Sequence, residues 1–256
     1  MTPLVFIAAA LAGLAIGTLG GGGAILTVPA LVYLAGQGAH DATAGSLVIV
    51  GVAALVGLIP HARRGQVRVR SGLVVGALGA AGAVIGSGLG QRVEPELLLT
   101  GFGALLLIVG ALMLHRAVKR PSDRPEPETD PGPRTVRLVV AATIAGLLTG
   151  FFGVGGGFIL VPMLALALGF PMPAAVGTSL LIIALNSAAG LLGRSGQLLD
   201  LDWSLIAVFT AVTMIASLLG ARLSTRLSAR TLGIAFAVLL LGIGVFMAIE
   251  NLPHLV

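Results

Sequence analysis

The chain has 256 residues, of which 57% are hydrophobic and 10% are charged. Soluble domains have about 25% charged residues, so this composition excludes a soluble globular protein and predicts a membrane protein. The net charge is +5 and cysteine is absent, which excludes disulfides, thiol chemistry and cysteine metal sites. The basic residues lie between apolar segments and not in one stripe with aromatic residues, so we expect no nucleic-acid partner.

Eight apolar runs follow one another along the chain, and a helical span needs about 20 apolar residues. The runs cover residues 3–36, 42–60, 71–91, 97–114, 137–170, 174–193, 203–221 and 231–249. The first and fifth runs are each 34 residues long, too long for one span and too short for two. Because both contain a glycine cluster, we expect in each a full helix that breaks at the glycines and continues as a re-entrant or discontinuous second piece. The predicted fold class is therefore an all-α polytopic membrane protein.

The two halves of the chain repeat each other at an offset of 133 positions, as between Gly13 and Gly146. GLAIGTLGGGGAILTVP (13–29) corresponds to GLLTGFFGVGGGFILVP (146–162). We expect two homologous repeats, each with one glycine-broken helix and three spanning helices. The predicted division is an N-terminal transmembrane repeat (1–118), a charged, proline-rich cytoplasmic linker (119–136) and a C-terminal transmembrane repeat (137–256). Such a duplication with broken helices is typical of transporters.

The distribution of the 15 Lys and Arg residues distinguishes two topologies. If each half has four simple spans, the repeats are parallel, and Arg222, Arg226 and Arg230 lie outside. If each broken helix returns to the side from which it entered, the repeats are inverted, and only Arg92 and Arg194 lie outside. The positive-inside rule favours the inverted arrangement, which we expect, with the parallel one as the alternative.

The glycine clusters are candidate anion-binding elements. A helix that starts after them would present unpaired N–H groups and the positive end of its dipole to a ligand. The glycines expected at the substrate site are Gly20, Gly21, Gly22, Gly23, Gly153, Gly155, Gly156 and Gly157. The GxxxG pairs Gly13–Gly17 and Gly146–Gly150 are assigned instead to close helix packing.

Polar side chains within the apolar runs form a second group of candidates. They are Thr43, Ser46, Thr178, Ser179 and Asn186, joined by Thr18 and Thr149 beside the glycines. Ser179 and Asn186 are seven residues apart and so share one helix face, where hydroxyl and amide donors suit sulfonate-type oxygens. The alternative for Thr43 is a hydrogen bond to its own helix, and for Asn186 a bond between helices.

Charged and catalytic groups are sparse in the predicted spans. All 10 carboxylates fall outside the apolar cores, and no Lys or Arg is expected in the membrane to neutralise an anion. His61, beside Pro60 and Arg63, is a titrating candidate near a cavity mouth, but we expect an interfacial surface histidine there. Hydrolase, zinc-protease and P-loop motifs are absent, so we expect no enzyme, no cofactor and no metal site.

The motifs resemble those of the TauE/SafE-like sulfite exporter family. The residues that carry the resemblance are the glycine-rich segments 20–29 and 153–162 and the helix starts AGSL (44–47) and GTSL (177–180). The resemblance covers essentially the whole chain, and it implies a bacterial inner-membrane permease for sulfur-containing anions, commonly in the export direction. The chain departs from the pattern where Ala24 stands opposite Gly157, which leaves open whether both halves contribute equally to the site.

We therefore expect a multi-pass permease of the cell inner membrane that exports a small sulfur-containing oxyanion, sulfite or a short organosulfonate, by alternating access. The expected partners are this small anionic substrate, the lipid bilayer and, in a homodimer, a second copy of the chain. Two alternatives stay open. One is a permease for another small anion or a metal ion, and the other is a non-transporting membrane scaffold or assembly factor.

Overall fold

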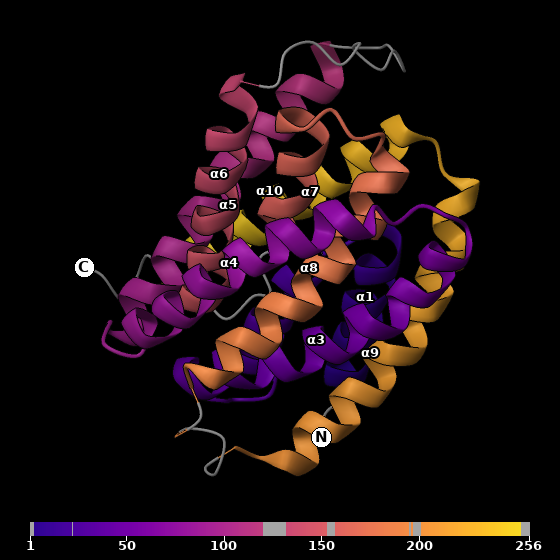
Figure 1. The fold of residues 1–256 in the computed structure, drawn as a ribbon. Coiled ribbons are helices and arrows are strands. Elements are labelled where there is room, and N and C mark those ends of the chain that lie inside the picture. The colour runs from indigo at the N-terminus through magenta and orange to yellow at the C-terminus, as the bar shows by residue number, and fades with distance from the viewer. Residues whose placement is uncertain are drawn as a thin grey trace.

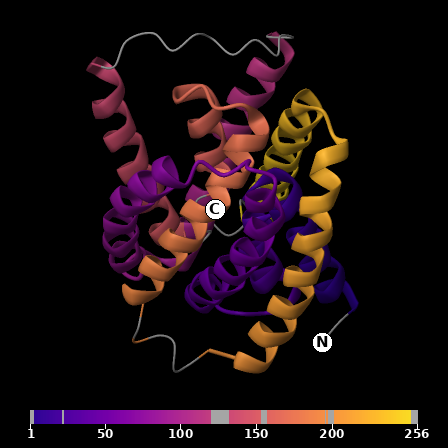
Figure 2. The ribbon, with the colours of Figure 1, turned by 45° about the vertical axis from the view of Figure 1, so that its right-hand side comes forward.

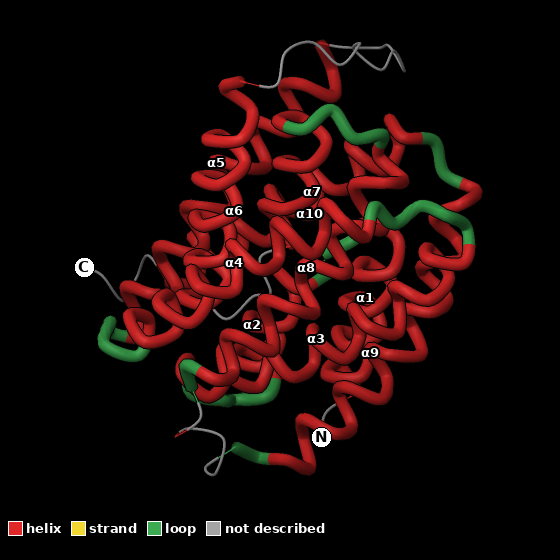
Figure 3. The backbone as a smooth tube through the Cα atoms, viewed as in Figure 1, coloured by secondary structure: helices red, strands yellow, loops and turns green. Residues whose placement is uncertain are grey.

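The computed structural model of the chain describes residues 3–21, 23–119, 132–152, 157–194, 196 and 201–251. Within these ranges every regular element is helical, and short loops join the helices (Figures 1 and 3). The elements in chain order are α1 (Pro3–Leu19), α2 (Ala24–Pro29), the π-helix η1 (Ala30–Leu34), α3 (Ala39–Arg63), α4 (Val69–Gly90), α5 (Pro95–Lys119), α6 (Gly132–Phe152), α7 (Gly157–Pro162), the π-helix η2 (Met163–Ala167), α8 (Met172–Leu192), α9 (Trp203–Leu223), the 3₁₀ turn η4 (Ser224–Arg226) and α10 (Ala229–Asn251). The predicted all-α class is confirmed.

The long helices have the length and composition of membrane spans. Six of them, α3, α4, α5, α8, α9 and α10, are long and apolar enough to cross a bilayer. Helix α1 has 17 residues, which at 1.5 Å each gives about 25 Å, close to the hydrocarbon thickness of about 30 Å. Large apolar side chains such as Leu4, Ile108 and Leu219 are exposed on the outer surface, where lipid would cover them. The chain is a multi-pass membrane protein.

The first long apolar run folds as a helical hairpin. The chain reverses after α1 at Gly20 and Gly21, which have φ of +68° and +129°, a region that favours glycine. The α2–η1 segment then runs back along α1, so that Ala30 lies in the same core cluster as Val5 and Ala9 near the start of α1. This run is therefore a full helix followed by a re-entrant return, one of the two forms that its length predicts.

Each short helix changes to π geometry directly after a proline. Pro29 ends α2 and Pro162 ends α7, and a π-helix follows in both cases. Proline has no N–H to donate, and a π turn re-pairs the backbone through i→i+5 hydrogen bonds. The N–H of Ala35 accordingly donates to Ala30 O, and that of Leu168 donates to Met163 O.

The bundle has one strongly basic end. One cavity at this end is lined by residues from the ends of α1, α3 and α9 and from the starts of α8 and α10. We call this end the basic face; its arginines are Arg63, Arg64, Arg68, Arg222 and Arg226. The opposite face holds the start of α1, the end of η1 and the start of α9. In Figure 2 the basic face is at the top, with the last turn of α5 and the first turn of α6.

Small residues allow the helices of the two halves to pack closely. Helix α1 packs on α9, and α6 packs on α4. A Cβ on Gly17 would collide with the main chain of Ser217 in α9, and one on Gly150 with the main chain of Ala83 in α4. Gly13 and Gly146 face their partners in the same way. The packing role predicted for these GxxxG glycines is confirmed.

The middle of the predicted linker, residues 120–131, lies outside the described residues. Helix α5 extends to Lys119 and α6 begins at Gly132, so the last residues assigned to the linker (119–136) already belong to a helix.

Candidate functional site

The glycine reversal after α1 packs against the start of α8, in the other half of the chain. The Ser179 hydroxyl lies within hydrogen-bonding distance of Gly20 O and, at 2.8 Å, of Val176 O. A Cβ on Gly20 would lie 2.7 Å from Ser179 Oγ and from the Val176 main chain. The structure therefore brings together two of the predicted site residues, Gly20 and Ser179, although they are far apart in the sequence.

The other glycines of the clusters have different surroundings. The Ala24 N–H donates to Gly21 O at 3.1 Å, and a Cβ on Gly23 would collide with the main chain of Ala12 in α1. These contacts tighten the hairpin. Gly157 begins α7. The remaining candidates lie outside the described residues: Gly22, Gly153, Gly155 and Gly156.

Four buried hydroxyls of the predicted site donate to carbonyls of their own helix. They are Thr18 to Leu14 O (2.7 Å), Thr43 to His40 O (2.7 Å), Ser46 to Thr43 O (3.1 Å) and Thr149 to Ala145 O (2.7 Å). The back-bonding alternative is thus observed for Thr43. These hydroxyls can still accept a hydrogen bond from a ligand, because each oxygen keeps its lone pairs.

Thr178 has a tertiary partner. Its Oγ1 accepts a hydrogen bond of 3.0 Å from the backbone N–H of Arg68, just before α4. The Arg68 guanidinium lies 4.3 Å from the centroid of the Phe170 ring. The start of α8 is therefore tied both to the α1 hairpin, through Ser179, and to the loop before α4.

Asn186 is the most unusual of the predicted residues. It is fully buried, and neither its Nδ2 nor its Oδ1 has a hydrogen-bond partner among the described residues. The bond between helices weighed for this side chain is not formed there. The amide faces α4, where a Cβ on Gly79 would lie 2.8 Å from Nδ2. The neighbouring Ser187 Oγ also has no partner within the described part of the chain, so α8 presents polar atoms there that a ligand or water can satisfy.

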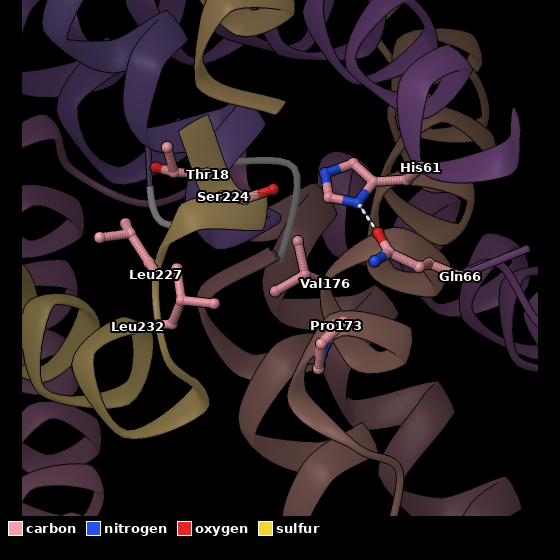
Figure 4. A pocket seen from close by; sticks show the side chains of 8 residues that line it. All are labelled: Thr18, His61, Gln66, Pro173, Val176, Ser224, Leu227 and Leu232. Atoms are coloured by element: carbon pink, nitrogen blue, oxygen red, sulfur yellow. Dashed lines mark hydrogen bonds between the residues drawn. The ribbon is translucent and has the colours of Figure 1, made fainter. Parts of the chain in front are cut away.

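His61 is not the interfacial surface residue that the sequence predicts. Only 1% of it is exposed, because it lies in the last turn of α3 and faces inward. Its Nε2 donates to Gly17 O at 3.0 Å, and its Nδ1 lies 2.8 Å from Gln66 Oε1. His61 and Gln66 line a cavity of about 130 Å³ at the basic face, with Thr18 and Ser224 among the other lining residues (Figure 4).

Arg194 is buried although it lies in the loop just after the α8 span. It follows the last turn of α8 and is 1% exposed. Its Nη2 donates to Gly150 O (3.2 Å) and Phe151 O (3.3 Å) at the end of α6. Burial lowers the pKa of this guanidinium to about 10, so it is still positively charged at neutral pH. The loop position suggested by sequence is right, but burial depends on how α6 and α8 pack.

The sequence contains a signal for both of these side chains. The 133-residue offset that pairs Gly17 with Gly150 also pairs His61 with Arg194. Equivalent positions in the two halves thus hold basic residues, which composition and hydropathy do not reveal.

These features define a class: a multi-pass helical membrane protein with a glycine-built helical hairpin and buried polar groups inside the bundle. The chain belongs to the family described as Sulfite exporter TauE/SafE, which matches residues 5–247. The resemblance seen in the glycine-rich segments is confirmed, and the protein is a membrane transporter of this family.

Relatives with the name "probable membrane transporter protein" cover almost the whole chain. One from Xylella fastidiosa (strain Temecula1) is 34% identical over 249 residues, which are 96% of this chain and 94% of the relative. YunE from Bacillus subtilis is 26% identical over 273 residues, 96% of this chain and 98% of the relative. No solved structure matches the chain.

Proposed function

We propose that this transporter is a permease of the cytoplasmic (inner) membrane that exports a small sulfur-containing oxyanion, sulfite or a short organosulfonate. The family description supports the substrate class. The observation that carries the proposal is the contact between the glycine reversal of one half and Ser179 of the other, beside a cavity lined by both polar and apolar side chains. A binding site between two halves is the arrangement that alternating access requires.

The proposal includes two inverted repeats. The order of helices from α1 to α5 recurs from α6 to α10, and α1 packs on α9 as α6 packs on α4. Pro173 and Val176, at the start of α8, line the cavity at the basic face, whereas the equivalent helix α3 reaches that cavity with His61, near its end. Equivalent helices that run in opposite directions support inversion, and the positive-inside rule supports a cytoplasmic location for the arginine-rich basic face.

The substrate-binding residues proposed are the glycines and polar side chains of the two broken-helix regions. They are Gly20, Gly21, Gly22, Gly23, Thr43, Ser46, Gly153, Gly155, Gly156, Gly157, Thr178, Ser179 and Asn186. Of these, Ser179 and Asn186 contribute most in our proposal, because one joins the two halves and the other presents an unpaired amide.

Flux through the purified protein tests the proposal. Labelled sulfite and a panel of short sulfonates are loaded into proteoliposomes and protein-free liposomes, with sulfate, chloride and a divalent cation as competitors. We expect saturable sulfite flux that sulfonates inhibit and cations do not. Flux of a metal ion would favour the alternative of a cation permease. Saturable flux of an unrelated anion would replace sulfite as the assigned substrate. No flux of any solute would favour a scaffold.

A further inference from the structure

Arg64, which ends α3, holds its guanidinium in a fixed position beside the cavity at the basic face. Its Nη1 donates to Ala221 O, in the last turn of α9, at 2.8 Å. The same oxygen accepts a bond of 2.9 Å from the hydroxyl of Ser224, which lines the cavity. Because both bonds end on one atom, Arg64 Nη1 and Ser224 Oγ are at most about 5.7 Å apart, the sum of the 2.8 and 2.9 Å bonds. The guanidinium therefore lies at the edge of the cavity.

The backbone of Arg64 is tied to the other wall of the same cavity. Its N–H donates to His61 O at 3.2 Å, and the N–H of Gln66 donates to the same oxygen at 3.1 Å. His61 and Gln66 line the cavity, and in Figure 4 they form one wall, opposite Ser224. Arg64 thus reaches across the edge of the cavity, from the end of α3 to the end of α9.

The charge of Arg64 is not neutralised by the described part of this face. Arginine is always charged in proteins, and Arg64 is exposed. The described carboxylates lie at the other end of the bundle, where α3, α5 and α9 start and α10 ends; they are Asp41, Glu94, Glu96, Asp202 and Glu250. Arg64 therefore has no ion-pair partner among the described residues, and an anion can supply the counter-charge.

The guanidinium also keeps donors for a ligand. Its N–H groups form a planar fork that matches the oxygens of an oxyanion, and the bond to Ala221 O uses only one of its nitrogens. The cavity beside it, of about 130 Å³, has room for several water molecules and so for a small oxyanion.

The neighbouring arginines lack this arrangement. The guanidinium of Arg68 lies 4.3 Å from the centroid of the Phe170 ring, a cation–π contact. Arg63 is exposed at the end of α3, and no hydrogen bond within the described residues ties its side chain to the cavity. Arg64 differs from both because a hydrogen bond fixes its charge at the edge of the cavity.

We propose that Arg64 is an anion-binding residue at the basic-face entrance of the transport path, where it attracts the oxyanion and holds it at the cavity. This inference rests on the proposed function, since it assigns a residue to one end of the path of the oxyanion. The simpler role of Arg64 is to cap the end of α9, so the experiment must separate charge from capping.

The test measures the half-saturation concentration for labelled sulfite in membrane vesicles of both orientations. Potassium gluconate sets the ionic strength to about 0.01 M or about 1 M, where the Debye length is about 30 Å or about 3 Å. Arg64→Gln keeps an amide that can bond Ala221 O but removes the charge, whereas Arg64→Lys keeps the charge. Arg63→Gln is the matched control, because it removes the same charge from an exposed position one residue earlier.

At low ionic strength, we expect Arg64→Gln to raise the half-saturation concentration about fivefold in the orientation that exposes the basic face, as the loss of one charge about 4 Å from the anion predicts. This difference from the wild type should shrink at high ionic strength, because salt screens the charge. Arg64→Lys should retain most of the affinity, and Arg63→Gln should stay close to the wild type.

Thermal unfolding in detergent identifies a variant that fails to fold. If Arg64→Gln does not fold, Arg64→His replaces it, and the substrate is a labelled sulfonate, which stays ionised. The half-saturation concentration of this variant should rise between about pH 6 and about pH 8, as the histidine loses its charge, and that of the wild type should not.

Equal shifts in Arg64→Gln and Arg63→Gln would assign the effect to the general charge of the basic face and overturn the inference. An unchanged half-saturation concentration in Arg64→Gln, with or without a lower unfolding temperature, would reduce Arg64 to a helix cap and overturn it as well. Absence of flux in wild-type vesicles would instead overturn the proposed function, so the two failures are distinguishable.

Discussion

At the scale of single residues, the buried polar side chains divide into satisfied and unsatisfied ones. Thr43, Ser46 and Thr149 donate to their own helices, and such side chains remain paired whether or not substrate is bound. Asn186 is the opposite case, a buried amide with no partner for either polar atom in the described part of the protein. A group of this kind destabilises the empty protein, which is understandable if the substrate or its water shell pairs with it.

Asn186→Leu should therefore separate stability from function. Removing the unpaired amide should raise the unfolding free energy by about 1–3 kcal/mol or leave it unchanged, while sulfite affinity falls. Thermal unfolding and proteoliposome flux measure the two effects. Gly79→Ala should also lower sulfite flux, because a Cβ there would lie 2.8 Å from Asn186 Nδ2. Gly88→Ala, on the same helix and with nothing within 4 Å, is the control. A large loss of stability in Asn186→Leu would assign this side chain to packing.

At the scale of elements, the hairpin of α1 with α2 and η1 belongs to the N-terminal half and packs against α8 of the C-terminal half. Two independent properties of its reversal require glycine at position 20. The backbone there is left-handed, and the residue packs closely on α8. Gly20 has φ of +68° and contacts Ser179 and Val176, whereas Gly65 has the same φ of +68° with nothing within 4 Å of its Cβ position. Substitutions at Gly20 and Gly65 therefore separate the cost of a left-handed backbone from the cost of losing the contact with α8.

Gly65→Ala should lose about 1–2 kcal/mol of stability from the left-handed backbone alone, and should transport normally. Gly20→Ala should lose clearly more, because its Cβ would also push the hairpin away from α8, and its flux should fall strongly. Thermal unfolding of the two purified variants and flux in proteoliposomes provide the comparison. Equal losses in both measurements would mean that the hairpin does not depend on its contact with Ser179.

At the scale of the whole molecule, the arrangement of the helices bears on the topology. The basic face gathers loops from both halves, and this is the distribution that the positive-inside rule demands of a single cytoplasmic side. In the inverted arrangement that we propose, equivalent loops of the two halves lie on opposite sides of the membrane, and the arginines of the basic face occur in non-equivalent loops.

Cysteine labelling in intact cells tests this topology against a background free of native cysteine. Gly196→Cys, between α8 and α9, should react with an impermeant thiol reagent, and Ser228→Cys, before α10, should react only after permeabilisation. Parallel repeats would give the reverse pattern. Both positions are exposed, so a lack of reaction at either one reports the side of the membrane and not burial.

Much of this protein could be predicted from the sequence alone. Hydropathy located the spans because lipid imposes the same apolar requirement on every crossing helix. The 133-residue repeat predicted the duplicated order of elements, the GxxxG packing and the family. Proline and glycine marked the broken helices at residues 13–29 and 146–162, because their backbone restrictions are local.

The tertiary structure decided which polar groups meet. The contact of Ser179 with Gly20, the burial of His61 and Arg194, and the unpaired amide of Asn186 all depend on where helices of different halves cross. Hydropathy depends on the amino acid and not on its neighbours in space, so a histidine at the end of a span has the same hydropathy whether it faces lipid headgroups or a cavity. Only the packing of α1 and α8 around the glycine reversal distinguishes these cases.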